Sequence, residues 1–117
     1  MDFDFIAKYT VGFEDFLSYL LGEKDGIPKS ANWASDICEI ETEIIKNLAK
    51  EMSSKRTMIS VSWSLTRQDH GEQPFWMAIV LSCMLGQIGL PGGGFGFGYS
   101  ATIVSYTHLT LPTIYSV

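Results

Sequence analysis

Hydrophobic side chains recur every three or four positions along the first half of the chain, which is the spacing of one helix face. The clearest stripe runs from Ile40 to Met52, with glutamates at its start and lysines towards its end, as the helix dipole favours. Shorter helices are predicted for residues 2–9 and 13–21, and another after Ser30, a typical N-cap residue. The pattern therefore predicts four helices before residue 57.

The hydrophobic period changes after residue 57, where Ile59, Val61 and Trp63 alternate with serines as in a β-strand. Residues 74–88 are then apolar on nearly every side, which predicts a buried helix, because a membrane span needs about 20 residues. A lone strand cannot satisfy its own backbone, so partner strands are expected outside this chain. The predicted class is α/β: a helix-rich fragment with about five helices and one strand that is not an independent fold.

Charge is distributed unevenly along the 117 residues, which carry 13 acidic and 8 basic side chains for a formal net charge of −5. That balance argues against a nucleic-acid partner, which would need clustered Lys and Arg. Every charged side chain lies at or before Glu72, so the last third of the chain has none. Cys38 and Cys83 form no CxxC pair and cannot alone hold zinc or an iron–sulfur cluster. We expect the uncharged third to be partly buried in a larger protein and partly not native.

The C-terminal tail is the part expected not to be native. Residues 104–113 read Val-Ser-Tyr-Thr-His-Leu-Thr-Leu-Pro-Thr, which matches in one reading frame the translation of a transposase-type sequencing adapter. An ordinary β-prone tail is the alternative. We therefore expect residues 1–103 to be part of a native domain and 104–117 to be adapter read-through, in which His108 has no function.

The glycine-rich run at residues 89–98 invites a phosphate-binding interpretation, which its spacing does not support. A P-loop needs a lysine, and the run has none; the third glycine of a dinucleotide fingerprint would fall on Phe97 or Tyr99. The run also follows a predicted helix, where either motif would follow a strand. It is therefore predicted to be a tight loop.

The polar segment 62–73 is more informative, because it follows the predicted strand at the end where α/β sheets bind ligands. It combines an indole, hydroxyls, a guanidinium, an imidazole and amides, which suits a planar, anionic, hydrogen-bonding ligand. The alternative is a polar loop that covers a helix end, with Arg67 paired to Asp69 or Glu72. Composition alone leaves both open.

Several motifs in order along the chain resemble those of the molybdopterin oxidoreductases. They are Tyr-Thr-Val-Gly-Phe at 9–13, Trp-Ala at 33–34, Ser-Trp-Ser-Leu-Thr-Arg at 62–67, His-Gly-Glu-Gln at 70–73, and Met-Leu-Gly-Gln-Ile-Gly-Leu-Pro-Gly-Gly-Gly-Phe-Gly at 84–96. The sequence looks most like the dimethyl sulfoxide, trimethylamine N-oxide and biotin sulfoxide reductase branch, from about residue 3 to 103. The resemblance implies a fragment of a Rossmann-like central domain in a much longer enzyme.

The resemblance also implies the chemistry: a molybdenum ion held by two molybdopterin guanine dinucleotides removes oxygen from small S-oxides or N-oxides. By position, Trp63, Ser64 and Arg67 would contact the cofactor, with His70 and Gln73 as weaker candidates. Ser62 and Asp69 depart from the family's commoner residues without removing a contact. The residue that ligates molybdenum would lie outside this chain, so no metal ligand or catalytic residue is assigned.

The same resemblance implies an electron donor such as a cytochrome or reductase. It also implies a role in anaerobic respiration and a periplasmic location, or a cytoplasmic one for the biotin sulfoxide type. No transmembrane segment is expected. A small helical binding module without cofactor or activity is the alternative function.

Overall fold

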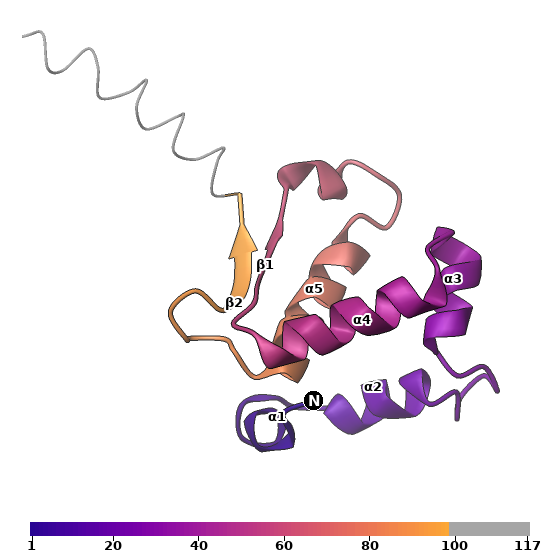
Figure 1. The fold of residues 1–117 in the computed structure, drawn as a ribbon, viewed down its shortest axis with the longest axis horizontal. Helices are drawn as coiled ribbons and strands as arrows, with labels where there is room; N and C mark the ends of the chain where they lie inside the picture. The colour runs from indigo at the N-terminus through magenta and orange to yellow at the C-terminus, as the bar shows by residue number, and fades with distance from the viewer. Residues whose placement is uncertain (99–117) are drawn as a thin grey trace, which may run out of the picture.

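The computed structural model describes residues 1–98, which form five α-helices, one 3₁₀ helix and two strands (Figure 1). In chain order the elements are α1 (Phe3–Tyr9), α2 (Phe13–Leu20), α3 (Ala31–Cys38), α4 (Thr42–Ser54), β1 (Met58–Val61), η1 (Trp63–Thr66), α5 (Glu72–Leu85) and β2 (Gly94–Phe97). The helices predicted from hydrophobic spacing and the α/β class are thus confirmed.

Two helices begin at side chains that cap them. The Asp2 carboxylate accepts the Phe5 N–H at 2.9 Å at the start of α1, and the Ser30 hydroxyl accepts the Trp33 N–H at 3.2 Å at the start of α3. Each bond satisfies a backbone donor that the first helical turn leaves without a partner. Ser30 therefore caps the third helix as its sequence position predicts.

The glycine-rich run contains a strand, so the predictions of a single strand and of a loop throughout this run are wrong. Residues 94–97 form β2, which pairs in parallel with β1 in the register Met58 to Gly94 through Val61 to Phe97. One partner strand of β1 therefore lies within this chain. The alternation Gly-Phe-Gly-Phe has the period of a strand and places both phenylalanines on one face.

β1, α5 and β2 form a β–α–β unit in which α5 contacts both strands. Both strands run in the same direction, and η1 follows β1 at the edge where β1 and β2 end (Figure 1). α5 runs back from this edge, so its N-terminus lies on the same side as the carboxyl ends of the strands (Figure 1). This edge is where parallel sheets bind ligands.

The Gln87 side chain, just after α5, forms hydrogen bonds with the segment that leads into β1. Its Oε1 accepts the Thr57 N–H at 2.6 Å, and its Nε2 donates to the Lys55 carbonyl oxygen at 2.9 Å. Nearby, Arg56 donates to the Pro91 carbonyl oxygen at 2.9 Å. These bonds connect residues 30 or more positions apart and hold the segment after α5 against the strand entry.

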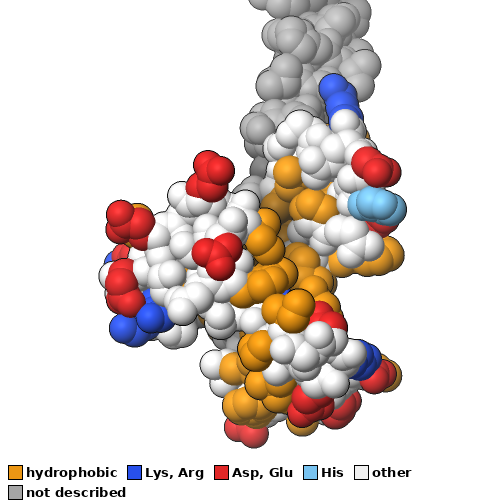
Figure 2. Space-filling model, turned by 90° about the vertical axis from the view of Figure 1, so that its right-hand side faces the viewer, with side chains coloured by type: hydrophobic (Ala, Val, Ile, Leu, Met, Phe, Trp, Pro, Cys, Tyr) orange, Lys and Arg blue, Asp and Glu red, His pale blue; other side chains and the backbone are white. Residues whose placement is uncertain are grey.

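α5 is a helix as predicted, but in this chain it is buried only at Ala78 and Ser82. Trp76 is 56% exposed and Met77 45% exposed in this chain, and the burial of this helix within a larger protein stays a prediction. Apolar side chains gather in a band between the charged parts of the surface (Figure 2). Among residues 1–98, the only hydrophobic side chains classed as buried belong to Ile6 and Ala78.

The sparse core leads to a prediction about the chain in isolation. A polypeptide of residues 1–98 should lack a cooperative thermal transition and should associate, because few of its apolar side chains are buried and many large ones are exposed. Differential scanning calorimetry and light scattering check this. A monomer with one sharp calorimetric transition would contradict the expectation.

Candidate functional site

The candidate site is the edge of the two-stranded sheet at which both strands end, β1 at Val61 and β2 at Phe97. η1 begins two residues after β1 ends, and α5 begins at Glu72 on the same side. A helix N-terminus presents free backbone N–H groups and a partial positive charge. The edge therefore combines a polar turn with a helix end that favours acceptor-rich or anionic groups.

The 3₁₀ turn brings three predicted site residues together. Trp63 starts the turn, Ser64 follows, and Arg67 closes it with its N–H donating to the Ser64 carbonyl at 3.0 Å. The Ser62 and Ser64 hydroxyls share a hydrogen bond of 2.5 Å, and Thr66 Oγ1 donates to the Trp63 carbonyl at 2.8 Å. Because residues three apart eclipse in a 3₁₀ helix, Ser64 and Arg67 lie on the same side of the turn.

Gly71 lets the loop fold back onto this turn. A Cβ at Gly71 would lie 2.7 Å from the Leu65 carbonyl oxygen and 2.8 Å from the Thr66 backbone, so no larger residue fits without movement. His70 precedes it with a left-handed backbone, φ 54°, which is uncommon outside glycine. The close approach places His70 and the first turn of α5, which contains Gln73, beside η1.

The charged side chains of the loop are not paired in the way that the alternative interpretation of segment 62–73 predicts. His70 lies 3.8 Å from an Asp69 carboxylate oxygen and 3.9 Å from one of Glu72, whereas Arg67 forms no ion pair within residues 1–98. The alternative in which Arg67 pairs with Asp69 or Glu72 is therefore wrong for the described part of the chain. Segment 62–73 holds one basic and two acidic side chains, so Arg67 is its only fixed cation.

The indole of Trp63 is held by β2. It stacks on Phe97 with ring centroids 5.1 Å apart and planes 18° apart, and Phe75 of α5 meets Phe97 edge-on at 5.1 Å. Trp63 nonetheless remains 50% exposed. Phe97 was not a predicted site residue, and the period-two alternation of residues 94–97 was the signal that could have identified it.

The predicted residues therefore gather at one edge in three neighbouring pieces. Trp63, Ser64 and Arg67 lie in or next to η1, His70 lies in the loop, and Gln73 lies in the first turn of α5, where its N–H donates to the His70 carbonyl at 3.0 Å. All five are exposed in the described part of the chain. Their indole, hydroxyl, guanidinium and amide groups fit a ligand that combines flat rings with many acceptors, as a pterin dinucleotide does.

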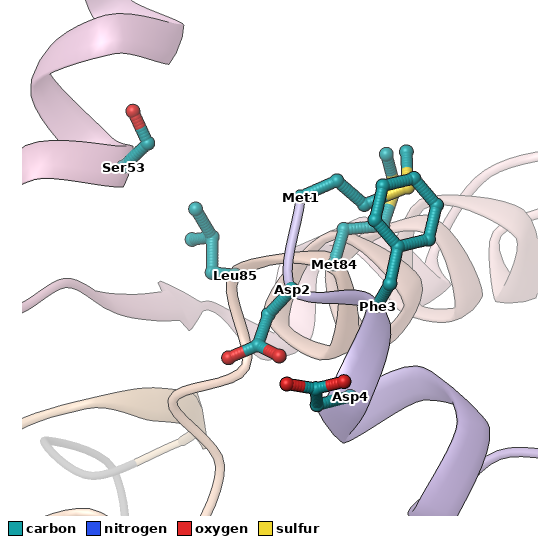
Figure 3. A pocket seen from close by; sticks show the side chains of 7 residues that line it. All are labelled: Met1, Asp2, Phe3, Asp4, Ser53, Met84 and Leu85. Carbon is teal, nitrogen blue, oxygen red and sulfur yellow. The ribbon is translucent and has the colours of Figure 1, made fainter.

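Two cavities of the described residues lie away from the candidate site. One of about 580 Å³ is lined by Met1, Asp2, Phe3, Asp4, Ser53, Met84 and Leu85, and its two carboxylates point away from the cluster of Met1, Phe3 and Met84 (Figure 3). A second, more apolar cavity of about 590 Å³ lies between α4 and the C-terminal half of α5. Neither cavity is lined by a predicted site residue.

The described residues contain neither a metal centre nor a membrane-spanning helix. No three or more His, Cys, Asp or Glu side chains among residues 1–98 form a group that could hold a metal ion. Both cysteines are free thiols, and burial raises the pKa of the Cys83 thiol, which disfavours its nucleophilic thiolate form. No helix in this range combines the length and apolarity that a bilayer crossing requires.

Comparison with known proteins identifies the family. The sequence profile of the molybdopterin oxidoreductases matches residues 22–111. The chain is 59% identical over 98 residues to a dimethyl sulfoxide/trimethylamine N-oxide reductase of Rhodobacter capsulatus and 58% identical to trimethylamine-N-oxide reductase 1 of Escherichia coli K12. Each alignment covers 84% of this chain and 12% of the relative, so the chain spans about an eighth of their length. The chain belongs to the molybdopterin oxidoreductase family.

Proposed function

We propose that this chain is a segment of a molybdenum-dependent reductase that removes an oxygen atom from small N-oxides or S-oxides. The proposal rests on its identity to reductases that are named for dimethyl sulfoxide and trimethylamine N-oxide. A cofactor-free helical module is the weaker alternative, because it explains neither this identity nor the donors gathered at the sheet edge. When bound, the molybdenum–pterin group supplies the two-electron oxygen-transfer chemistry.

The role proposed for this segment is to hold the cofactor, as a bis(molybdopterin guanine dinucleotide), at the carboxyl edge of the sheet. Arg67 would donate a bidentate pair of hydrogen bonds to phosphate or pterin acceptors, and Ser64 would add a hydroxyl donor on the same side. Trp63 would contact a flat ring of the cofactor. His70 and Gln73 are the weaker candidates for cofactor contact. The observation that carries this proposal is that the Arg67 guanidinium has no ion-pair partner among residues 1–98, in a residue that directly follows η1.

The remaining parts of the proposal concern the whole protein. A periplasmic location and an electron donor such as a cytochrome follow if the enzyme acts on trimethylamine N-oxide or dimethyl sulfoxide in anaerobic respiration. A cytoplasmic location would follow if it acts on biotin sulfoxide.

The test is to recover the full-length gene and purify its product from cells grown with molybdate. We expect stoichiometric molybdenum and pterin, and reduction of trimethylamine N-oxide or dimethyl sulfoxide by a reduced viologen dye. Product from cells grown with tungstate in place of molybdate should contain little molybdenum and reduce neither oxide at a comparable rate. Molybdate-grown protein without molybdenum or pterin would overturn the proposal.

We also propose that residues 104–117, which lie outside the described part of the chain, derive from a sequencing adapter. Reads of the same locus from a library made without that adapter should diverge from the present codons after residue 103. In the full-length protein, native sequence should then follow Ile103. The same codons in an adapter-free library would contradict this.

A further inference from the structure

Phe97, the last residue of β2, and Gly98, which follows the strand, both lie against the Trp63 indole. Phe97 covers one face of the indole, in the near-parallel stack described above, and is itself fixed by the edge of Phe75. Among residues 1–98, Phe97 is the only aromatic ring in contact with Trp63. Trp63 is 50% exposed, and no aromatic ring among residues 1–98 covers the opposite face of its indole.

Gly98 meets a different part of the same ring. A Cβ on Gly98 would lie 2.8 Å from both Cδ1 and Cε2 of Trp63 and closer still to Nε1, which lies between them. Nε1 is bonded to both Cδ1 and Cε2, so a Cβ directly above Nε1 would lie closer than 2.8 Å to these two carbons. The Cβ position is therefore displaced outward past the ring edge, on the side of the indole N–H. The indole N–H edge thus faces the backbone at Gly98, where a side chain would collide with it.

We propose that Phe97 and Gly98 are positioning residues that orient Trp63 so that it binds a pterin ring by stacking, and not through its N–H. With one face on Phe97 and the N–H edge turned to Gly98, the group left for a ligand is the second face. A flat heteroaromatic ring is the chemistry that an exposed indole face recognises. This inference rests on the proposed function, because it specifies how one residue of that site contacts the cofactor.

The first part of the test compares two replacements of Trp63 in the full-length holoenzyme. Trp63→Phe keeps a flat ring and removes the N–H, whereas Trp63→Leu removes both. Two quantities are measured: the pterin content that remains after long dialysis, and kcat/KM. For Trp63→Phe we expect both to stay within about threefold of the wild-type values. For Trp63→Leu we expect both to fall about tenfold or more. Equal losses in the two variants would show that the N–H makes the contact and would overturn the inference.

The second part tests the positioning role with a matched pair on β2. Phe97→Leu removes the ring beneath Trp63, while Phe95→Leu changes the same residue type two positions earlier on the same strand face, opposite Ile59. Phe97→Leu should reproduce the pterin loss of Trp63→Leu, the double variant should add little to it, and Phe95→Leu should retain pterin. If Phe95→Leu and Phe97→Leu lose pterin equally, the effect is general strand destabilisation and the positioning role is wrong.

The two proposals fail in different ways. Wild-type holoenzyme that contains molybdenum and pterin, with Trp63→Phe as damaging as Trp63→Leu, would reject the stacking inference and leave the proposed function standing. Wild-type protein without molybdenum or pterin would reject both. Should Phe97→Leu lower the melting temperature too far for assay, the Trp63→Phe and Trp63→Leu comparison alone decides the stacking contact.

Discussion

Replacing Arg67 with alanine in the full-length protein should lower its cofactor content and its kcat/KM for oxide reduction by more than about tenfold. Arg67 is the only fixed cation of segment 62–73, and it lies on the same side of η1 as Ser64. Removing a charged donor from a desolvated contact leaves its acceptors unpaired, which costs roughly 2–5 kcal/mol. Molybdenum and pterin per protein, together with kcat/KM for trimethylamine N-oxide and dimethyl sulfoxide, measure the effect.

Two further variants sharpen the Arg67 result. Arg67→Lys keeps the charge but loses the planar fork, so it should recover only part of the cofactor content. Lys46→Ala removes an exposed cation of α4, whose pair with Glu43 at 2.9 Å should contribute less than about 1 kcal/mol. Cofactor content in Arg67→Ala equal to that in Lys46→Ala would remove Arg67 from the site.

Replacing Gln87 with leucine should destabilise the β–α–β unit by about 1–3 kcal/mol, because the half-buried Thr57 N–H would lose its acceptor. The Lys55 carbonyl oxygen would lose its donor in the same variant. In the full-length protein, hydrogen exchange at the Thr57 amide should accelerate by roughly 5- to 150-fold, and the melting temperature should fall.

The controls for Gln87 separate the amide from side-chain size. Gln87→Glu keeps an acceptor for Thr57 but places a carboxylate oxygen against the Lys55 carbonyl, so it should also be destabilising. Asn47→Leu changes an exposed amide on α4 and should leave exchange at Thr57 unchanged. Unchanged exchange in Gln87→Leu would mean that the amide does not hold the strand.

The helices could be predicted from sequence because their signals are local. Asp2 and Ser30 cap helices with bonds that span three residues, and the α4 stripe reports a single face. β2 could not be predicted with equal ease, because glycines in a row favour a loop by composition and the strand becomes evident only from its pairing with β1. Strand pairing is a long-range property, so local pattern specifies it weakly.

The sequence predicts that the candidate residues follow a strand, but it does not predict their detailed geometry, and their role stays a prediction. The place of Trp63 and Arg67 after a strand followed from the serine alternation, whereas the Phe97 stack depends on a strand that was missed. The position of His70 beside Asp69 and Glu72 depends on a left-handed backbone at His70 and a close approach at Gly71. The Phe97 stack and the close approach at Gly71 depend on how the backbone folds, which the order of charged residues along the loop does not indicate.

The parallel pairing of β1 and β2 also affects how the protein is made. Met58 and Gly94 are partners although they lie 36 positions apart, so β1 cannot pair with β2 until β2 has been synthesised. At about 5–20 residues per second, synthesis delays this pairing by some seconds, and the exit tunnel prolongs the interval. During that time the nascent chain exposes both a strand edge and the apolar α5, which chaperones bind. Slower translation of the codons between the strands would lengthen this exposure, so synonymous changes there bear on the yield of folded protein.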